Sequence, residues 1–303
     1  MRLGAYTFSC QLQDEALLPE FKGSTLRGGL GHALKRVVCA LRRKSCGDCL
    51  LAPGCAYTFL FEADKNGDAQ SRRPHPYLLS APEDPRRHWR AGDQLDFTLT
   101  LFGKANDYLP HLVYAFKELG EAGLGKKQQS NGRLLLQKVS MGQHPVWQGD
   151  KLQPPPQLPE LTLTPALPGP LTSLALRCHT PLRLKYENHL QHSLPFHLLI
   201  RAALRRISSL EAAYGDGEPA LDYKGLAARA ADVKVAGGDC RWREIRRYSS
   251  RQKKEMLIGG MEGEMHYRGD DLSEFLPLLR YCEQVHLGKQ TTFGLGRISV
   301  EER

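Results

Sequence analysis

The stretch His286-Leu-Gly-Lys-Gln-Thr-Thr-Phe-Gly-Leu-Gly-Arg297 carries the strongest indication of the fold and of its use. Its three glycines can adopt positive φ values and leave backbone amides uncovered by a Cβ atom. The side chains between and after them are cationic, hydroxylic or aromatic: Lys289, Thr291, Thr292, Phe293 and Arg297. Amides, hydroxyls and cations suit a polyanion backbone, and a flat ring suits a stacked base. A tight hairpin with solvated charges would look the same, so the interpretation depends on the rest of the chain.

The two halves of the chain repeat one pattern. An alternating segment, an amphipathic helix and a Gly-Leu-Gly loop with a cation follow one another at 93–101, 108–119 and 120–127, and again at 257–267, 272–281 and 286–297. A strand and a helix precede each set, at 3–12 and 24–41 and at 173–184 and 196–213. Strand-helix-strand repeated twice is the ferredoxin-like pattern. The sequence therefore predicts an α+β fold of tandem ferredoxin-like domains with antiparallel sheets.

Proline marks the boundary between the halves. Residues 151–170 contain seven prolines and no aromatic residue, which prevents a helix or a central strand. We expect an N-terminal domain at 1–150, a linker at 151–170 and a C-terminal domain at 171–303.

The composition favours a soluble protein that binds polyanions. Among 303 residues, Lys+Arg 42 against Asp+Glu 33 gives a net charge of +9. No apolar run approaches the ~18 residues of a membrane span, and the first residues lack the apolar core of a signal peptide. We therefore expect a cytoplasmic protein with reduced cysteines and no membrane partner.

The helix at 24–41 carries a candidate catalytic histidine. His32 is followed at i+3 and i+4 by Lys35 and Arg36, which places all three on one face. Imidazole can exchange a proton near neutral pH, and a nearby cation can stabilise charge on a phosphorane. A surface histidine without a role is the alternative. Glycines at 28, 29 and 31 predict a close approach to this backbone, by a packed strand or by a phosphate.

A cysteine-rich insertion at 39–55 follows this helix. Cys39, Cys46, Cys49 and Cys55 could supply four thiolates to a structural zinc ion or to an iron–sulfur cluster. Unrelated buried thiols are the alternative. The following segment, 56–62, is predicted to be a strand.

A basic segment precedes the last sheet strand. Residues 241–254 contain seven cations interleaved with Trp242 and Tyr248, a composition typical of binding to single-stranded RNA or to the base of an RNA hairpin. A solvated, charged strand is the alternative. The arginines at 201–206 are interpreted instead as the solvent face of a helix.

Four motif regions together resemble the CRISPR repeat-processing endoribonucleases of the RAMP superfamily. They are the loop at 286–297, the string Leu26-Arg-Gly-Gly-Leu-Gly-His-Ala-Leu-Lys35, the cysteine-rich turn before Tyr57-x-x-Leu-Phe-Glu62, and Arg247-Tyr-Ser-Ser-Arg-Gln-Lys253 with Gly259-Gly-Met-Glu-Gly263. The resemblance implies tandem RAMP domains and cleavage of CRISPR precursor RNA within its repeats. It implies attack by the 2′-OH without a metal or other catalytic cofactor, leaving a 2′,3′-cyclic phosphate.

The resemblance also implies roles for individual residues. His32, Lys35 and Arg36 would be catalytic, with His286 as the second candidate for the histidine. The expected RNA contacts are Arg27, Lys126, Lys127, Arg247, Arg251, Lys253, Lys254, His286, Lys289, Thr291, Thr292, Phe293 and Arg297. The expected partners are repeat RNA and a CRISPR effector complex. Two alternatives remain: a non-catalytic RAMP subunit that holds guide RNA in such a complex, and a general single-strand RNA-binding protein.

Overall fold

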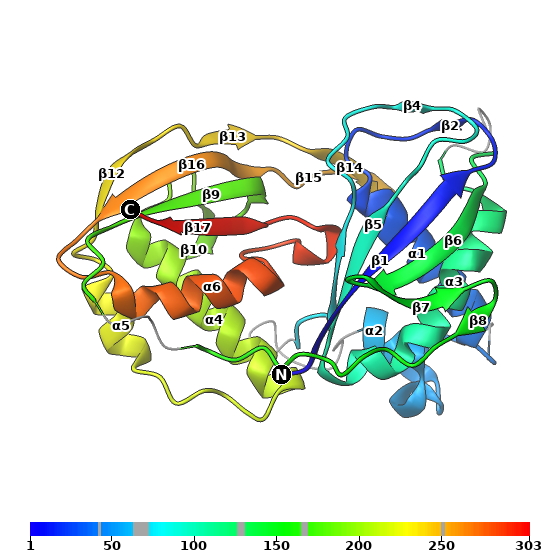
Figure 1. The fold of residues 1–303 in the computed structure, drawn as a ribbon, viewed down its shortest axis with the longest axis horizontal. Coiled ribbons are helices and arrows are strands. Elements are labelled where there is room, and N and C mark those ends of the chain that lie inside the picture. The colour runs from blue at the N-terminus through cyan, green and yellow to red at the C-terminus, as the bar shows by residue number, and fades with distance from the viewer. Residues whose placement is uncertain (42–43, 63–72, 126–130, 165–168, 250–251) are drawn as a thin grey trace. The chain divides into compact units, whose positions relative to one another are not determined.

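The computed structural model describes the chain except residues 42–43, 63–72, 126–130, 165–168 and 250–251 (Figure 1). The chain divides into two compact units, Met1–Glu160 and Leu161–Arg303. Among the described helices, none is long and apolar enough to cross a membrane.

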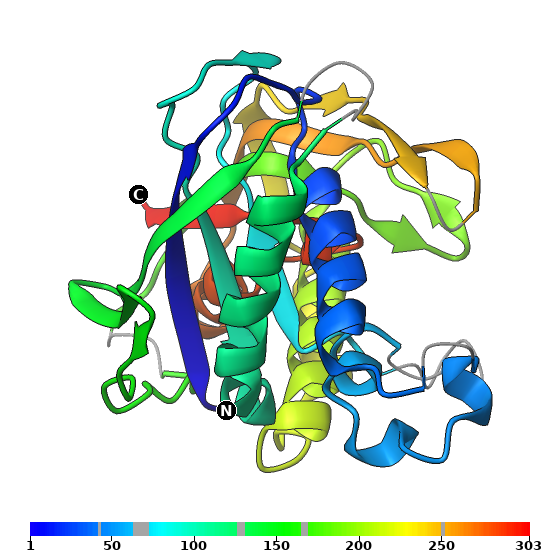
Figure 2. The ribbon, with the colours of Figure 1, turned by 90° about the vertical axis from the view of Figure 1, so that its right-hand side faces the viewer.

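The first unit is built on one six-stranded antiparallel sheet in the order β3-β5-β1-β6-β7-β8. Its strands are β1 (Leu3–Leu12), β3 (Tyr77–Ser80), β5 (Phe97–Phe102), β6 (Leu134–Met141), β7 (His144–Gln148) and β8 (Lys151–Leu152). The short strands β2 (Ala16–Leu17) and β4 (His88–Trp89) pair separately. Helices α1 (Gly23–Val38) and α3 (Leu109–Ala122) lie side by side on one face of the sheet (Figure 2). The remaining helical segments are η1 (Cys46–Asp48), η2 (Ala52–Gly54), α2 (Ala56–Phe61) and η3 (Gly103–Tyr108).

The second unit has a sheet in the order β12-β16-β9-β17, and β13 also pairs with β16. Its strands are β9 (Ser173–Leu182), β12 (Lys234–Gly238), β13 (Arg241–Arg243), β16 (Gly260–Arg268) and β17 (Ile298–Glu302). Two hairpins stand apart from it: β10 (Lys185–Tyr186) with β11 (His189–Leu190), and β14 (Arg246–Ser249) with β15 (Lys254–Leu257). Helices α4 (Phe196–Tyr214) and α6 (Leu276–Val285) pack together (Figure 1). The remaining helical segments are α5 (Tyr223–Arg229), η4 (Ser273–Phe275) and η5 (Thr291–Phe293).

Strand order confirms the predicted fold. If the four main strands of each unit are numbered along the chain, both sheets run second, third, first, fourth: β3-β5-β1-β6 and β12-β16-β9-β17. A helix follows the first strand and another follows the third in both units. This is the ferredoxin-like arrangement, present in tandem.

Aromatic packing ties helix to sheet in the first unit. Phe8 of β1 stacks on Phe97 of β5, its direct cross-strand partner, with ring centroids 5.1 Å apart. Phe116 of α3 lies 4.7 Å from each of these two rings. Burying three such side chains in contact stabilises both the sheet and its covering helix.

The glycines of α1 permit close packing of side chains. A Cβ at position 29 would lie 2.7 Å from Cδ1 of Leu119 in α3, and one at position 31 would lie 2.9 Å from the ring of Phe61. The predicted close approach therefore exists at positions 29 and 31, but side chains of the helices α3 and α2 make it in place of the expected strand. Position 28 has nothing within 4 Å.

The segment after the cysteines was predicted to be a strand, and that prediction is wrong. Residues Ala56–Phe61 form α2, in which Ala56, Leu60 and Phe61 are the buried side chains. Their spacing of four and five residues suits one face of a helix, and this packing overrides the β propensity of the aromatic residues.

Candidate nucleic-acid interface

The candidate catalytic face lies on α1. His32 and Arg36 are exposed, and Lys35 is half-buried with its ammonium 5.3 Å from the ring centroid of Tyr57. The three side chains stand within one helical turn, as the spacing predicts. An accessible imidazole beside two cations can exchange a proton and stabilise anionic charge.

Arg27 lies one turn earlier on α1 and is held by side chains of its own unit. Its Nε donates a hydrogen bond to the Tyr77 hydroxyl at 3.2 Å, and its guanidinium lies 5.0 Å from the Phe61 ring centroid. Burial raises the pKa of Tyr77 above its ordinary value. These contacts hold Arg27 against β3 and α2.

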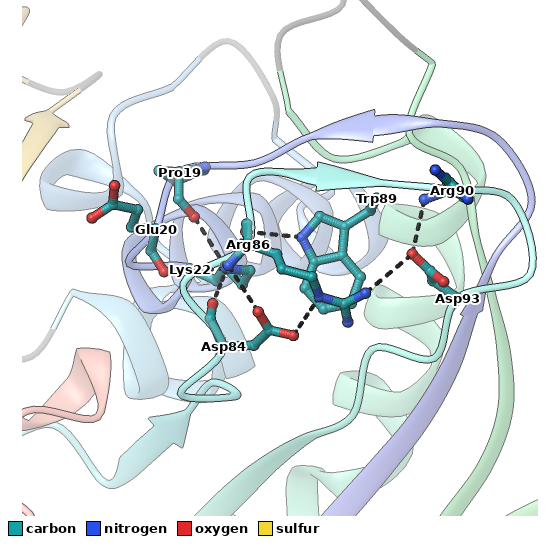
Figure 3. Close-up of polar contacts among 8 residues, drawn as sticks. All are labelled: Pro19, Glu20, Lys22, Asp84, Arg86, Trp89, Arg90 and Asp93. Carbon is teal, nitrogen blue, oxygen red and sulfur yellow. Dashed lines mark hydrogen bonds and ion pairs between the residues drawn. The ribbon is translucent and has the colours of Figure 1, made fainter.

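A buried lysine precedes α1, and no sequence pattern pointed to it. Lys22 is 1% exposed, and its ammonium donates hydrogen bonds to the carbonyl oxygens of Pro19, Glu20, Asp84 and Arg86 (Figure 3). The same ammonium lies 5.4 Å from the Trp89 ring centroid. Burial lowers the pKa of Lys22. The lysine thus connects the start of α1 to the segment that leads into β4.

The glycine-rich loop has the backbone conformation that the sequence predicts. Gly288, Gly294 and Gly296 have φ values of 82°, 87° and 74°. A Cβ at position 296 would lie 1.8 Å from the carbonyl oxygen of Leu287, so only glycine fits there. The amides of Gly294 and Gly296 donate to the carbonyls of Thr291 and Pro181. The structure differs from the sequence interpretation here, because one of these amides bonds within the loop and the other bonds to β9.

His286 is a structural residue in this loop. It is 5% exposed, and its Nδ1 donates to the carbonyl oxygen of Leu295 at 3.2 Å. Burial lowers its pKa to about 4, so the imidazole is neutral at neutral pH. Arg206 of α4 donates to the carbonyls of Val285 and His286 at 2.7 and 3.2 Å. Arg206 therefore anchors the loop, contrary to the expectation that it lies on a solvent face, and its burial lowers its pKa to about 10.

The loop also contacts the basic hairpin. Phe293 is 6% exposed, and the Arg247 guanidinium of β14 lies 4.6 Å from its ring centroid. Two segments predicted to bind RNA are thus in contact within one unit. Thr291 is buried as well, and Thr292 and Arg297 are half-buried. A base stacked on the Phe293 ring would have to displace side chains that cover it.

The exposed features of this region lie on the β14–β15 hairpin and at Lys289. Tyr248 of β14 is 61% exposed, and Lys253 and Lys254 at the hairpin turn are exposed too. Lys289 is exposed, while its amide donates to the Arg183 carbonyl. Tyr248 is therefore the accessible ring beside these cations. Arg251, Lys126 and Lys127 lie outside the described residues.

The four clustered cysteines do not form a metal site in this structure. Cys39 directly follows α1, Cys46 begins η1, Cys49 directly follows it, and Cys55 precedes α2, all as partly buried free thiols. In the part of the chain that the structure describes, no three His, Cys, Asp or Glu side chains are grouped so that they could hold a metal ion. Four thiolates would have to converge within ~2.3 Å of one ion. The prediction of a zinc or iron–sulfur site is therefore not supported, and the thiols are spread over separate short elements.

Comparison with known proteins gives matches over both units. A family model named AF_1859_N and described as an N-terminal domain matches residues 1–158, and the model of the CRISPR-associated endoribonuclease Cas6 matches residues 176–298. An uncharacterized protein of Archaeoglobus fulgidus is 25% identical over 281 residues, covering 92% of this chain and 91% of that protein.

Solved structures share the fold over the whole chain. A Cas6 product complex has a TM-score of 0.60 at 16% identity, covering 99% of both chains. A second Cas6 product complex has a TM-score of 0.55 at 20% identity, covering 100% of both chains. Cas6 of Thermus thermophilus has a TM-score of 0.58 at 16% identity, covering 99% of this chain and 98% of that one. The tandem ferredoxin-like arrangement is the fold common to all of them.

Proposed function

Because the chain belongs to the family that the AF_1859_N model describes, and its second half is a domain of the CRISPR-associated endoribonuclease Cas6 family, we propose that it cleaves CRISPR precursor RNA within the repeats. The products would be the guide RNAs. The observation that carries this proposal beyond the family match is His32, exposed on α1 within one turn of Lys35 and Arg36.

The proposed reaction is an internal transesterification. The 2′-hydroxyl next to the scissile bond loses its proton and attacks the adjacent phosphorus. The P–O5′ bond breaks, and the leaving 5′ oxygen takes up a proton. The products are a 2′,3′-cyclic phosphate and a 5′-hydroxyl, and the nucleophile comes from the RNA itself.

His32 would act as the general acid or the general base in this reaction. Lys35 and Arg36 would stabilise the additional negative charge on the phosphorane. In this scheme the cations do the electrostatic work, so the proposed reaction needs no divalent ion and no other cofactor.

The RNA would also bind to the β14–β15 hairpin and the neighbouring loop. Lys253, Lys254 and Lys289 present exposed cations for phosphates, and Tyr248 presents a ring for a base. Two Cas6-RT-Cas1–Cas2 complexes contain a chain of this fold. A CRISPR complex is therefore a further proposed partner besides repeat RNA.

Incubation with a CRISPR repeat RNA from the same genome, in the presence of EDTA, tests the proposal. We expect one discrete cut with a cyclic phosphate on the upstream product. A repeat with a 2′-deoxy nucleotide before the cut should bind and remain intact, and cleavage of that RNA at the normal rate would exclude the proposed nucleophile. Tight binding of the unmodified repeat without a cut would favour the non-catalytic RAMP subunit.

A further inference from the structure

A pocket of about 470 Å³ lies within the second unit, beside the glycine-rich loop. The β10 strand, the middle of α4, the start of α5 and the first loop residues surround it. Its polar wall is formed mainly by Arg183, Lys185, Tyr186, Arg201, Arg205 and Lys289. The arginines of α4 that the sequence assigned to a solvent face thus line a cavity together with a residue of the loop.

The cations that line this pocket outnumber its carboxylates. Its one acidic lining residue is Glu218, which accepts a hydrogen bond from the Ser208 hydroxyl at 2.7 Å. Within the described parts of the chain, Lys185, Arg201, Arg205 and Lys289 form no ion pair with a carboxylate. Burial and the nearby charges of Lys185, Arg205 and Arg183 lower the pKa of Lys289. Cations that repel one another in this way favour binding of an anion.

The pocket offers more than charge. Tyr186 is 36% exposed, and the Arg201 guanidinium lies 5.9 Å from its ring centroid. Leu198, Leu204 and Ala227 add an apolar wall. The volume falls in the range of ~300–1,000 Å³ that is typical of small-molecule pockets and is far larger than a phosphate ion needs. A phosphate joined to a flat, partly apolar base matches this combination.

We propose that this pocket binds one nucleotide of the single-stranded RNA, with the phosphate among Lys185, Arg205 and Lys289 and the base against Tyr186. The inference rests on the proposed function, and it adds a site away from the scissile bond. Gly288 and Lys289 belong to both the loop and the pocket wall. A single-stranded RNA that runs along the loop therefore reaches the pocket directly.

The test compares two pocket variants, Lys185→Ala and Arg205→Ala, with the matched control Lys224→Ala. The side chains of Lys185, Arg205 and Lys224 are all exposed, and Lys224 lies on α5 outside the pocket lining. Fluorescence anisotropy measures the Kd of repeat RNA blocked by a 2′-deoxy nucleotide, at several salt concentrations. We expect each pocket variant to raise the Kd by about tenfold, as for one lost charge-assisted contact. The plot of log association constant against log salt concentration should become less steep by about 0.7 in each pocket variant. The control should match the wild type.

A second readout locates the base. Ultraviolet crosslinking of the same RNA, followed by peptide mass spectrometry, should give an adduct on Tyr186 in the wild-type protein that is reduced in both variants. Millimolar adenosine monophosphate or inorganic phosphate should not compete at the ionic strength of the assay. Full competition by the mononucleotide or by phosphate alone would assign the pocket to a free ligand and overturn the RNA assignment.

Cleavage of unblocked repeat RNA separates this inference from the proposed function. A wild-type protein that cuts RNA, with pocket variants whose Kd and crosslink are unchanged, would refute the pocket and leave the endonuclease intact. A protein that never cuts, but whose pocket variants lose affinity and the crosslink, would refute the cleavage and support the pocket.

Discussion

Replacing Lys22 by methionine tests how α1, the helix that carries His32, is held. The ammonium donates to carbonyl oxygens at 2.5 Å (Asp84) and 2.9 Å (Arg86), and to those of Glu20 and Pro19 at 3.2 and 3.3 Å. Methionine keeps the apolar stem and donates nothing. Each buried acceptor left unsatisfied costs ~1–3 kcal/mol, and the two shorter bonds dominate. We therefore expect the free energy of unfolding to fall by ~2–6 kcal/mol for this unit.

Hydrogen exchange of the full-length protein measures this effect locally. Amides in residues 82–93 and at the start of α1 should exchange faster in Lys22→Met, because that segment loses its connection to the helix. Urea unfolding followed by circular dichroism should show a lower midpoint. The matched control is Lys117→Met, whose ammonium pairs with Asp150 at the surface and whose side chain is 39% exposed. The control should unfold like the wild type.

An unchanged midpoint and unchanged exchange in Lys22→Met would refute this reasoning. The carbonyls would then accept hydrogen bonds from water, and Lys22 would be dispensable for placing α1. Normal folding with slower cleavage would instead show that the contact positions His32 without contributing to stability.

The sequence predicts the fold well because the fold depends on periodicity and glycine. Alternation and helical spacing identified β1, α1, α3, β9, α4 and α6. The strand order follows from the ferredoxin-like pattern once these elements are recognised. The prediction of a strand at 56–61 was wrong because the aromatic residues there favour a strand, whereas burial of one side of the segment selects a helix.

The site is predicted less well because burial cannot be read from residue type. His286 and Phe293 have the chemistry of an RNA contact, yet both are buried in the loop that they stabilise. Conversely, Lys22 looks like an ordinary surface lysine in the sequence and is buried among carbonyls. Arg205 and Lys289 lie 84 positions apart by number and share one pocket wall, a proximity that only the packing of α4 beside the loop creates.

Three further predictions concern catalysis, binding and pH. His32→Ala should slow single-turnover cleavage by ~10²–10⁴-fold while the affinity for repeat RNA stays within a few-fold, and an unchanged rate would remove His32 from the mechanism. Tyr248→Ala should weaken RNA binding by ~1–3 kcal/mol with an unchanged salt slope, as for one lost stacked base. Phe293→Ala should mainly destabilise the second unit. Weaker RNA binding with unchanged stability in this variant would instead identify Phe293 as the stacking ring. The last prediction follows from His286, whose pKa of about 4 in the folded protein lies below the ordinary value of 6.5 because the imidazole is buried. Between these two pH values the unfolded chain binds a proton that the folded chain does not, so stability is complete above pH 6.5 and falls as the pH drops toward 4. The total loss is about 3 kcal/mol. His286→Asn, which tolerates the positive φ and carries no titrating group, should remove most of this pH dependence from the exchange of amides 286–297. Burial also lowers the pKa of His75 in the first unit to about 4. The stability of the first unit should therefore keep its pH dependence in the His286→Asn variant. An equally steep loss of amide protection at 286–297 in both proteins would show that another group titrates there.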